Sequence, residues 1–104
     1  MEITLSPEMF TDGVCRVPFG QNKEAVFVIV DEEFPGRNAL GRINRVNCLI
    51  QSYDSSDRVE DVYLGTTVIG LGDQTVGVRS DHEELRGKAM TKDNMDRCVV
   101  ILYE

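Results

Sequence analysis

The chain contains one histidine, His82, and a nucleophile activated by an imidazole base would have to use it. The neighbouring carboxylates of Asp81 and Glu83 would raise its basicity. The same stretch also predicts the start of a short helix, where a solvated surface histidine is expected. Because a catalytic triad is defined by geometry and not by one residue type, we assign no catalytic residue. The sequence favours a binding protein over an enzyme.

The three cysteines, Cys15, Cys48 and Cys98, lack the Cys-x-x-Cys spacing of a zinc site. An odd number of scattered thiols argues against a disulfide framework and for a reducing compartment, so we expect a cytoplasmic protein. Cys48 and Cys98 lie in apolar segments, where cysteine behaves as a small hydrophobe. Cys15 precedes Arg16, which would depress the pKa of that thiol only if both side chains were exposed. We expect inert thiols, no metal and no cofactor.

Gly70, Gly72 and Gly77 form the nearest approach to a glycine-rich phosphate loop. Such a loop needs backbone N–H groups that converge at a helix N-terminus and, in a P-loop, a Lys-Ser/Thr pair. The residues that follow are strand-like and that pair is absent. The segment therefore predicts a hairpin turn.

Acidic residues outnumber basic ones by 18 to 11, and the formal net charge is -7. This balance disfavours direct nucleic-acid binding and binding to anionic membranes, because both need clustered Lys and Arg. It favours a basic protein partner, although charge of this size also keeps a small domain soluble. Acidic clusters at expected turns would form a negative rim that steers such a partner. The acidic residues expected to make this contact are Asp31, Glu32, Glu33, Asp54, Asp57, Glu60 and Asp61.

One loop departs from the acidic trend. It begins at Phe34, has two glycines and a proline, and carries Arg37 and Arg42, with Arg45 close behind. Arginine there would clamp a carboxylate or phosphate, or anchor an interface. The alternative is a connecting loop whose arginines neutralise Asp31–Glu33, since surface ion pairs are common and weak. We include the three arginines in the candidate contact surface.

The elements that must position these residues are short strands broken by turn residues. The clearest is Glu24–Asp31, whose near-continuous apolar run predicts a central strand or one buried on both faces. Pro18 places the preceding strand at a sheet edge or a strand end. Further strands are expected at Ile3–Leu5, Val14–Phe19, Val59–Ile69, Thr75–Arg79 and Arg97–Tyr103, with one turn of helix after Ser6.

The segment Ala39–Tyr53 is ambiguous. Its apolar residues recur at helical spacing, but they also alternate with polar ones, and Gly41 lowers helix propensity by about 1 kcal/mol relative to alanine. We expect a strand from about Asn44 to Tyr53 that forms a hairpin with Val59–Ile69. A helix over this segment is the alternative.

A capping box, Ser80 or Asp81 with a glutamate three residues later, predicts a short helix over residues 82–89. The predicted fold class is mainly β, a β-rich α+β arrangement of about seven short, mostly antiparallel strands in a small sandwich or barrel, with that one helix. The length predicts a single compact domain over residues 1–104. The N-terminal residues lack a secretory signal, and the apolar runs are too short to span a bilayer.

The residues thus favour a small acidic protein-binding module. It would be an inhibitor, an immunity-type protein or an adaptor that engages a basic partner, such as a nucleic-acid-handling protein, through acidic loops. A second hypothesis is a small-ligand binder or small enzyme whose pocket is lined by the Arg37–Arg45 loop and the Gly70–Gly77 turn. A third is a homo-oligomer in which Ala25–Val30 and Arg97–Tyr103 pair across an interface, provided that one of them lies at a sheet edge.

Overall fold

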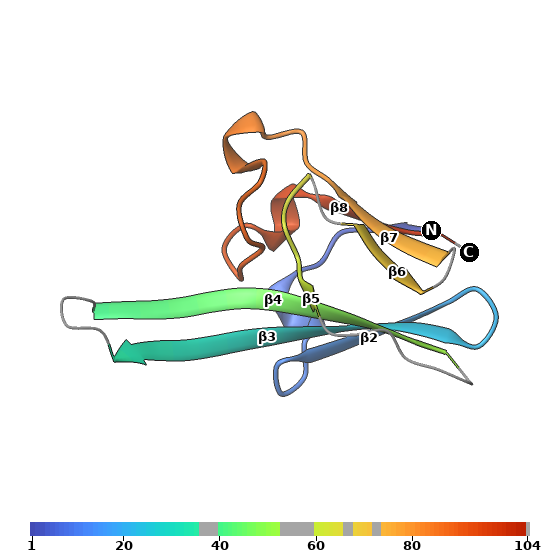
Figure 1. Ribbon diagram of the computed structural model, residues 1–104, viewed down its shortest axis with the longest axis horizontal. Helices are drawn as coiled ribbons and strands as arrows, with labels where there is room; N and C mark the ends of the chain where they lie inside the picture. The colour runs from blue at the N-terminus through green and yellow to red at the C-terminus, as the bar shows by residue number, and fades with distance from the viewer. Residues whose placement is uncertain (36–39, 53–59, 66–67, 72–73, 104) are drawn as a thin grey trace.

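The computed structural model describes residues 1–35, 40–52, 60–65, 68–71 and 74–103. In these residues the strands form two four-stranded antiparallel sheets, ordered β1-β8-β7-β6 and β2-β3-β4-β5 (Figure 1). The first sheet consists of β1 (Glu2–Ile3), β6 (Val68–Leu71), β7 (Gln74–Arg79) and β8 (Val99–Leu102). The second consists of β2 (Val14–Phe19), β3 (Lys23–Pro35), β4 (Leu40–Ser52) and β5 (Glu60–Asp61). The predicted mainly β, mostly antiparallel fold class is confirmed.

Strand β3 is the centre of the second sheet, with β2 on one side and β4 on the other. Its apolar run of valine, isoleucine and phenylalanine suits a pleated surface that packs on at least one face. The predicted strand Glu24–Asp31 lies within it, so the central position is confirmed. The observed strand is longer and ends at Pro35, because cross-strand pairing with β4 continues to the pair Pro35↔Leu40.

The ambiguous segment is extended and forms strand β4, so the helical alternative is wrong. It begins at Leu40, four residues before the predicted start at Asn44, and its register with β3 runs without a break to Lys23↔Ser52. Every second residue of β4 packs beside a β3 residue on the same face of the sheet. The free energy gained from this packing outweighs the weak helical spacing of the apolar residues. Ala39 and Tyr53 lie outside the described residues.

The turn from β2 into β3 is fixed by local chemistry. Gly20 and Asn22 both adopt positive φ, at 55° and 58°, which glycine and asparagine tolerate best. The strands close with Phe19 opposite Lys23. Pro18, which has no N–H to donate, lies in β2 at the edge of the sheet, as its chemistry predicts.

The core lies between the two sheets. Alternate residues of β2, β3 and β4 point inward, among them Cys15, Phe27 and Cys48, which are cross-strand neighbours. Val78 and Val100 of the first sheet belong to the same buried cluster. The loops complete it with the buried side chains of Leu5, Val62, Leu64, Leu85, Met90 and Met95.

The chain crosses between the sheets after β5, so the predicted continuous strand Val59–Ile69 is wrong. Only Glu60 and Asp61 pair with β4, opposite Cys48 and Asn47. The backbone of Val62 then bridges two segments: its N–H donates to Val46 O at 2.9 Å and its O accepts from Met90 N–H at 2.7 Å. The expected antiparallel contact with β4 is present, but β6 pairs with β7 instead.

The predicted helix over residues 82–89 is replaced by one short turn. The 3₁₀ helix η2 (Glu83–Leu85) has His82 at its N-cap without a side-chain cap hydrogen bond, and Ser80 Oγ instead accepts from the His82 N–H at 3.2 Å. Gly87, at φ 83°, turns the chain away, and Leu64 N–H donates to Lys88 O at 2.8 Å. Pairing with a distant segment therefore ends the helix.

Two further 3₁₀ turns lie in the described chain, η1 (Pro7–Met9) and η3 (Met95–Arg97). The helical turn expected after Ser6 is therefore present, with Pro7 at its first position. Within the described ranges, no helix has the length and apolar character needed to cross a membrane.

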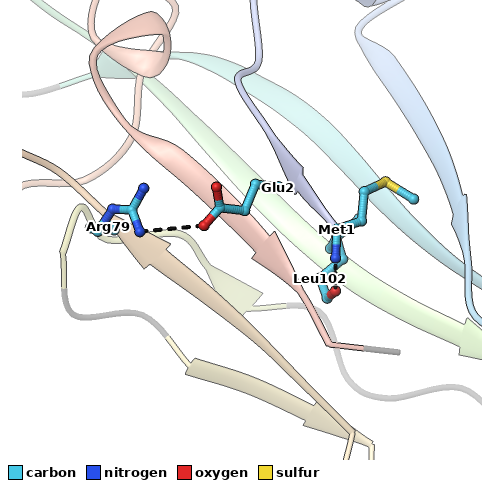
Figure 2. Close-up of polar contacts among 4 residues, drawn as sticks. All are labelled: Met1, Glu2, Arg79 and Leu102. Carbon is cyan, nitrogen blue, oxygen red and sulfur yellow. Dashed lines mark hydrogen bonds and ion pairs between the residues drawn. The ribbon is translucent and has the colours of Figure 1, made fainter.

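The two ends of the described chain lie side by side in the first sheet (Figures 1 and 2). The N-terminal ammonium of Met1 donates to Leu102 O at 2.8 Å, and the Leu102 N–H donates to Met1 O at 2.7 Å. Figure 2 also shows Arg79 reaching Glu2 across β8, with Nη1 and Oε1 3.3 Å apart. Strands β1 and β8 are both shorter than predicted. Arg97 lies in η3 rather than in β8.

Candidate functional site

The long β3–β4 hairpin projects beyond the rest of the second sheet (Figure 1). On one side β2 ends its pairing with β3 at Val14↔Val28, followed by a 2.8 Å hydrogen bond from Ile29 N–H to Gly13 O. On the other side, Val46 N–H donates to Met90 O at 2.8 Å. We call residues 31–35 of β3 and 40–44 of β4 the distal hairpin. Among the described strands, none besides β3 and β4 takes part in it.

The distal hairpin carries the acidic run Asp31–Glu33. The register places these residues opposite Asn44, Ile43 and Arg42. The strand prediction for Asp31 is confirmed, whereas the turn predicted after it is wrong, because Glu32 and Glu33 continue β3. The extended backbone holds three consecutive acidic residues on an element that projects from the body of the molecule.

Strand β5 carries the second acidic pair, Glu60 and Asp61, which lie on a strand as predicted. Asp61 lies opposite Asn47 of β4, whereas Asp31 lies opposite Asn44 of the same strand. The two acidic segments therefore flank β4 with an offset of three residues, about 10 Å along the strand. The sheet order places both clusters beside β4, although they are about 30 residues apart in sequence, and the odd offset puts Asp31 and Asp61 on opposite faces of the sheet.

Arg45 and Asp61 form an ion pair across β4 and β5, with Nε and Oδ1 3.0 Å apart. The two side chains are 28% and 35% exposed, so water screens the pair in part. This matches the alternative interpretation of Arg45, in which arginine neutralises neighbouring acidic residues. The partner, however, is Asp61, a pairing that no local sequence pattern indicates.

Lys92 lies at the base of the distal hairpin and was not identified by sequence reasoning. Its Nζ is 4.0 Å from Asp31 Oδ2, and its N–H donates to Asn44 Oδ1 at 3.4 Å. Its loop is shaped by Asn94 Oδ1, which accepts from the Thr91 N–H at 2.7 Å. The turn-forming residues Thr91–Asn94 are a local signal for that loop, but its contact with β3 and β4 depends on the fold.

A hollow of about 380 Å³ lies beside this contact. It is lined by Pro7, Phe10, Gly13, Ile29, Asp31 and Lys92. Its lining is mainly apolar, with the acidic Asp31 and the basic Lys92 at one side. The hollow is therefore a shallow pocket beside the distal hairpin with room for a side chain.

The remaining predicted contact residues fall in two groups. Arg42 lies in β4 with its backbone opposite Glu33. Arg37, Asp54 and Asp57 lie outside the described residues.

The thiols are buried, as their apolar surroundings predict. Burial raises the pKa of Cys48 to about 12, and burial together with the Asp96 carboxylate raises the pKa of Cys98 to about 11. Burial also raises the pKa of Cys15, whose side chain lies in the core while Arg16 lies exposed on the opposite face of β2. None of these thiols is a nucleophile at neutral pH.

His82 lies on the surface, with Nδ1 3.5 Å from the Glu84 carboxylate. It borders a small hollow of about 200 Å³ that also includes Arg79, Asp96 and Arg97. The hollow holds both signs of charge. The one thiol beside it, Cys98, donates to Met95 O at 3.2 Å.

The Arg37–Arg45 loop and the Gly70–Gly77 turn belong to different sheets. Arg42 and Arg45 lie in β4, whereas Gly70 and Gly77 lie in β6 and β7, which form the predicted hairpin with Leu71 opposite Gln74. The end of the β3–β4 hairpin and the β6–β7 hairpin lie at opposite ends of the molecule in Figure 1. The described parts of the two segments do not line a common pocket.

In the described part of the chain, no group of three or more His, Cys, Asp or Glu side chains is arranged to hold a metal ion. Comparisons with protein-family models, with curated proteins and with solved structures found no match to this chain.

Proposed function

We propose that this protein is a binding module that engages a basic protein through the acidic distal hairpin of β3 and β4. The observation that carries the proposal is the run Asp31–Glu33 on an element that projects from the two sheets. A partner can contact the charged residues of a projecting element without being complementary in shape to the rest of the molecular surface. Such a module would be an inhibitor, an immunity-type protein or an adaptor.

Charge supports the basic character of the partner. The molecule carries a net charge of -7, and Glu60 adds to the field on the other side of β4. Acidic surfaces of this kind attract basic partners over distances of about a Debye length, which is about 8 Å at physiological salt. A nucleic-acid-handling protein presents such a basic surface where it normally meets phosphate.

Two cations adjust this surface. Arg45 neutralises Asp61 at 3.0 Å, and Lys92 lies 4.0 Å from Asp31. They reduce the repulsion among the carboxylates and hold the base of the distal hairpin against the body. The proposed contact therefore consists of Asp31–Glu33 with Glu60 at its side, rather than of all the acidic residues equally.

The test is retention of a partner by the immobilised protein from source-cell extract at about 50 and about 300 mM salt. A triple variant, Asp31→Asn with Glu32→Gln and Glu33→Gln, removes three charges from the distal hairpin. The matched control, Asp81→Asn with Glu83→Gln and Glu84→Gln, removes three charges from exposed residues near η2.

The proposal requires one basic protein that is retained at low salt, reduced at high salt, lost with the hairpin variant and kept by the control. Equal retention by both variants would place the contact elsewhere. Retention that does not change with salt would argue against a charge-driven interaction.

A further inference from the structure

Strand β3 has an open edge in the distal hairpin. Its pairing with β2 ends at Val28 and is followed by the 2.8 Å hydrogen bond from Ile29 N–H to Gly13 O. Pairing with β4 on the other side continues to Pro35, so both strands extend beyond β2 (Figure 1). Among the described strands, residues 31–35 of β3 therefore have a neighbour on one side only. We call the other side the open edge.

The chain before β2 turns away from the open edge. Asp12 and Gly13 both adopt positive φ, at 52° and 78°. Thr11 and Val14 exchange two backbone hydrogen bonds, of 2.9 and 3.0 Å, which close a tight turn. Strand β2 therefore does not continue beside residues 31–35, although its direction would take it there.

The backbone of β3 determines which groups face the open edge. Ile29 directs its N–H toward β2, and successive residues of a paired strand direct their N–H and C=O groups to alternate sides. The backbone groups of Glu33 therefore point toward the open edge, whereas those of Glu32 point toward β4. An added strand would pair with Glu33 and leave the bonds of Glu32 in place.

The hollow of about 380 Å³ lies where the open edge begins, because Gly13, Ile29 and Asp31 line it together with Pro7 and Phe10. Ile29 packs against the core, and Asp31 lies on the same face of β3 because side chains alternate with a period of two. Cross-strand neighbours share a face of the sheet. In an added strand, the residue opposite Asp31 would therefore direct its side chain toward the hollow.

Charge and lining together define the segment that fits. The run Asp31–Glu33 and the net charge of -7 attract a basic segment and repel the same edge of a second copy. Opposite Asp31, however, a cation would meet the Lys92 ammonium, which already lies 4.0 Å from that carboxylate. An aliphatic side chain avoids this repulsion and contacts the apolar lining of the hollow.

We propose that the partner adds a basic, extended segment to the open edge of β3 as an antiparallel strand, with one aliphatic side chain in the hollow. This inference rests on the proposed function and adds to it the mode of binding and the anchoring residue. Strand addition supplies affinity through main-chain hydrogen bonds and specificity through pockets for alternate side chains. The antiparallel direction follows that of β2, which occupies the same side of β3 up to Val28.

The probe is a synthetic peptide with blocked ends, Lys-Thr-Lys-Leu-Lys-Thr-Lys. With its leucine opposite Asp31, the leucine and threonine N–H groups face β3 and the lysine N–H groups face away. Two-dimensional NMR of the ¹⁵N-labelled protein follows a titration to about 2 mM peptide at about 50 mM salt. The amide exchange of Glu33 is expected to slow on binding. That of Glu32, whose N–H points toward β4, is expected to stay unchanged.

Two N-methylated peptides of equal charge separate strand addition from charge attraction. Methylation of the leucine and threonine nitrogens blocks the side that faces β3, and is expected to weaken binding at least about tenfold. Methylation of three lysine nitrogens blocks the opposite side and is the matched control, with binding expected to persist. Exchange of the peptide leucine for glycine is expected to weaken binding about tenfold, because it empties the hollow.

A pair of protein variants tests the same hydrogen bond from the other side. Glu33→Pro removes the charge and the N–H, and proline is tolerated at a strand edge whose N–H is not part of the ladder. Glu33→Gln removes the charge alone. The proline variant is expected to bind the peptide about tenfold more weakly than the glutamine variant. If circular dichroism shows that the proline variant is unfolded, the N-methylated peptides supply the test on the wild-type protein.

Equal binding of the two N-methylated peptides overturns strand addition, and so does unchanged exchange at Glu33 in the presence of bound peptide. Absence of binding by the unmethylated peptide at about 2 mM overturns it too. These results leave a charge-driven contact with the distal hairpin standing. An acidic peptide with glutamate in place of lysine distinguishes the two proposals, because its binding as tightly as the basic one would contradict the proposed function itself.

Discussion

The Arg45 guanidinium and the Asp61 carboxylate, 3.0 Å apart, join β4 to the two-residue strand β5. Both side chains are about one third exposed, so their pairing is expected to contribute at most about 1 kcal/mol to stability. A double-mutant cycle with Arg45→Ala and Asp61→Asn, measured by urea unfolding, gives this coupling energy. A coupling well above that size would mean that the pair is more desolvated than its exposure indicates.

The buried thiols predict a loss of stability at alkaline pH. In the unfolded chain Cys48 ionises at a pKa near 9, whereas burial raises its pKa to about 12 in the folded protein. Between these values the unfolded state loses a proton that the native state keeps, so the free energy of unfolding falls as pH rises above about 9. Below pH 9 both states keep the proton and the stabilisation is fully present.

Cys48→Ala isolates this effect from the titration of lysine and tyrosine. The difference in slope between wild type and variant above pH 9 is expected to be about 1.4 kcal/mol per pH unit. Guanidinium unfolding at a series of pH values from 7 to about 10.5 supplies the two slopes. Parallel curves would show that the thiol ionises equally in both states.

Asn47 is expected to limit stability, because its buried Oδ1 has no hydrogen-bond partner. Asn47→Val removes the unsatisfied oxygen and suits a strand, so it is expected to stabilise the protein by about 1 kcal/mol. Asn47→Asp places a carboxylate there instead and is expected to destabilise it. Thermal unfolding of both variants at low protein concentration checks the two signs, and a destabilising valine would show that the amide makes a useful contact.

Phe27 and Val28 are adjacent in β3 but lie on opposite faces of the sheet. Phe27 is 0% exposed and belongs to the core cluster, so Phe27→Ala is expected to cost about 3–5 kcal/mol. Val28→Ala leaves no enclosed cavity and is expected to cost about 1 kcal/mol or less. Urea unfolding distinguishes these values. Equal costs would indicate that Val28 is packed as tightly as Phe27.

Strands with a strong local signal could be predicted from the sequence. The apolar run within β3 and the proline in β2 define a central and an edge strand by backbone and packing chemistry that acts within a few residues. The β2–β3 turn has a similar local cause in Gly20 and Asn22. Each of these features is specified by residues that are close in sequence.

The errors occurred where distant segments compete with local preference. The charges of Glu32 and Glu33 suggest a turn, but pairing with β4 keeps these residues extended. The capping box suggested a helix, but Leu64 bonds to the backbone of Lys88 and limits η2 to three residues. In both cases the partner is a segment whose position the sequence alone does not reveal.

The same distinction between local signals and contacts of distant segments applies to the candidate site. The acidic residues could be named from the sequence, but their arrangement around β4 could not. Lys92 is 61 positions from Asp31 in sequence and reaches it only because the loop before η3 meets the base of the distal hairpin. Sequence patterns of charge indicate what a surface holds, whereas the sheet order determines which charges become neighbours.

The position of β8 between β1 and β7 has a consequence for the order of folding. Strands β2, β3 and β4 pair with their immediate neighbours in sequence, so this part of the second sheet can form while the chain is still leaving the ribosome. Strand β1 is synthesised long before its partner β8, because Glu2 pairs with Ile101, and closing so large a loop is slow. Until β8 is synthesised, β1 lacks its strand partner, so the first sheet is expected to form after the β2–β3–β4 part of the second.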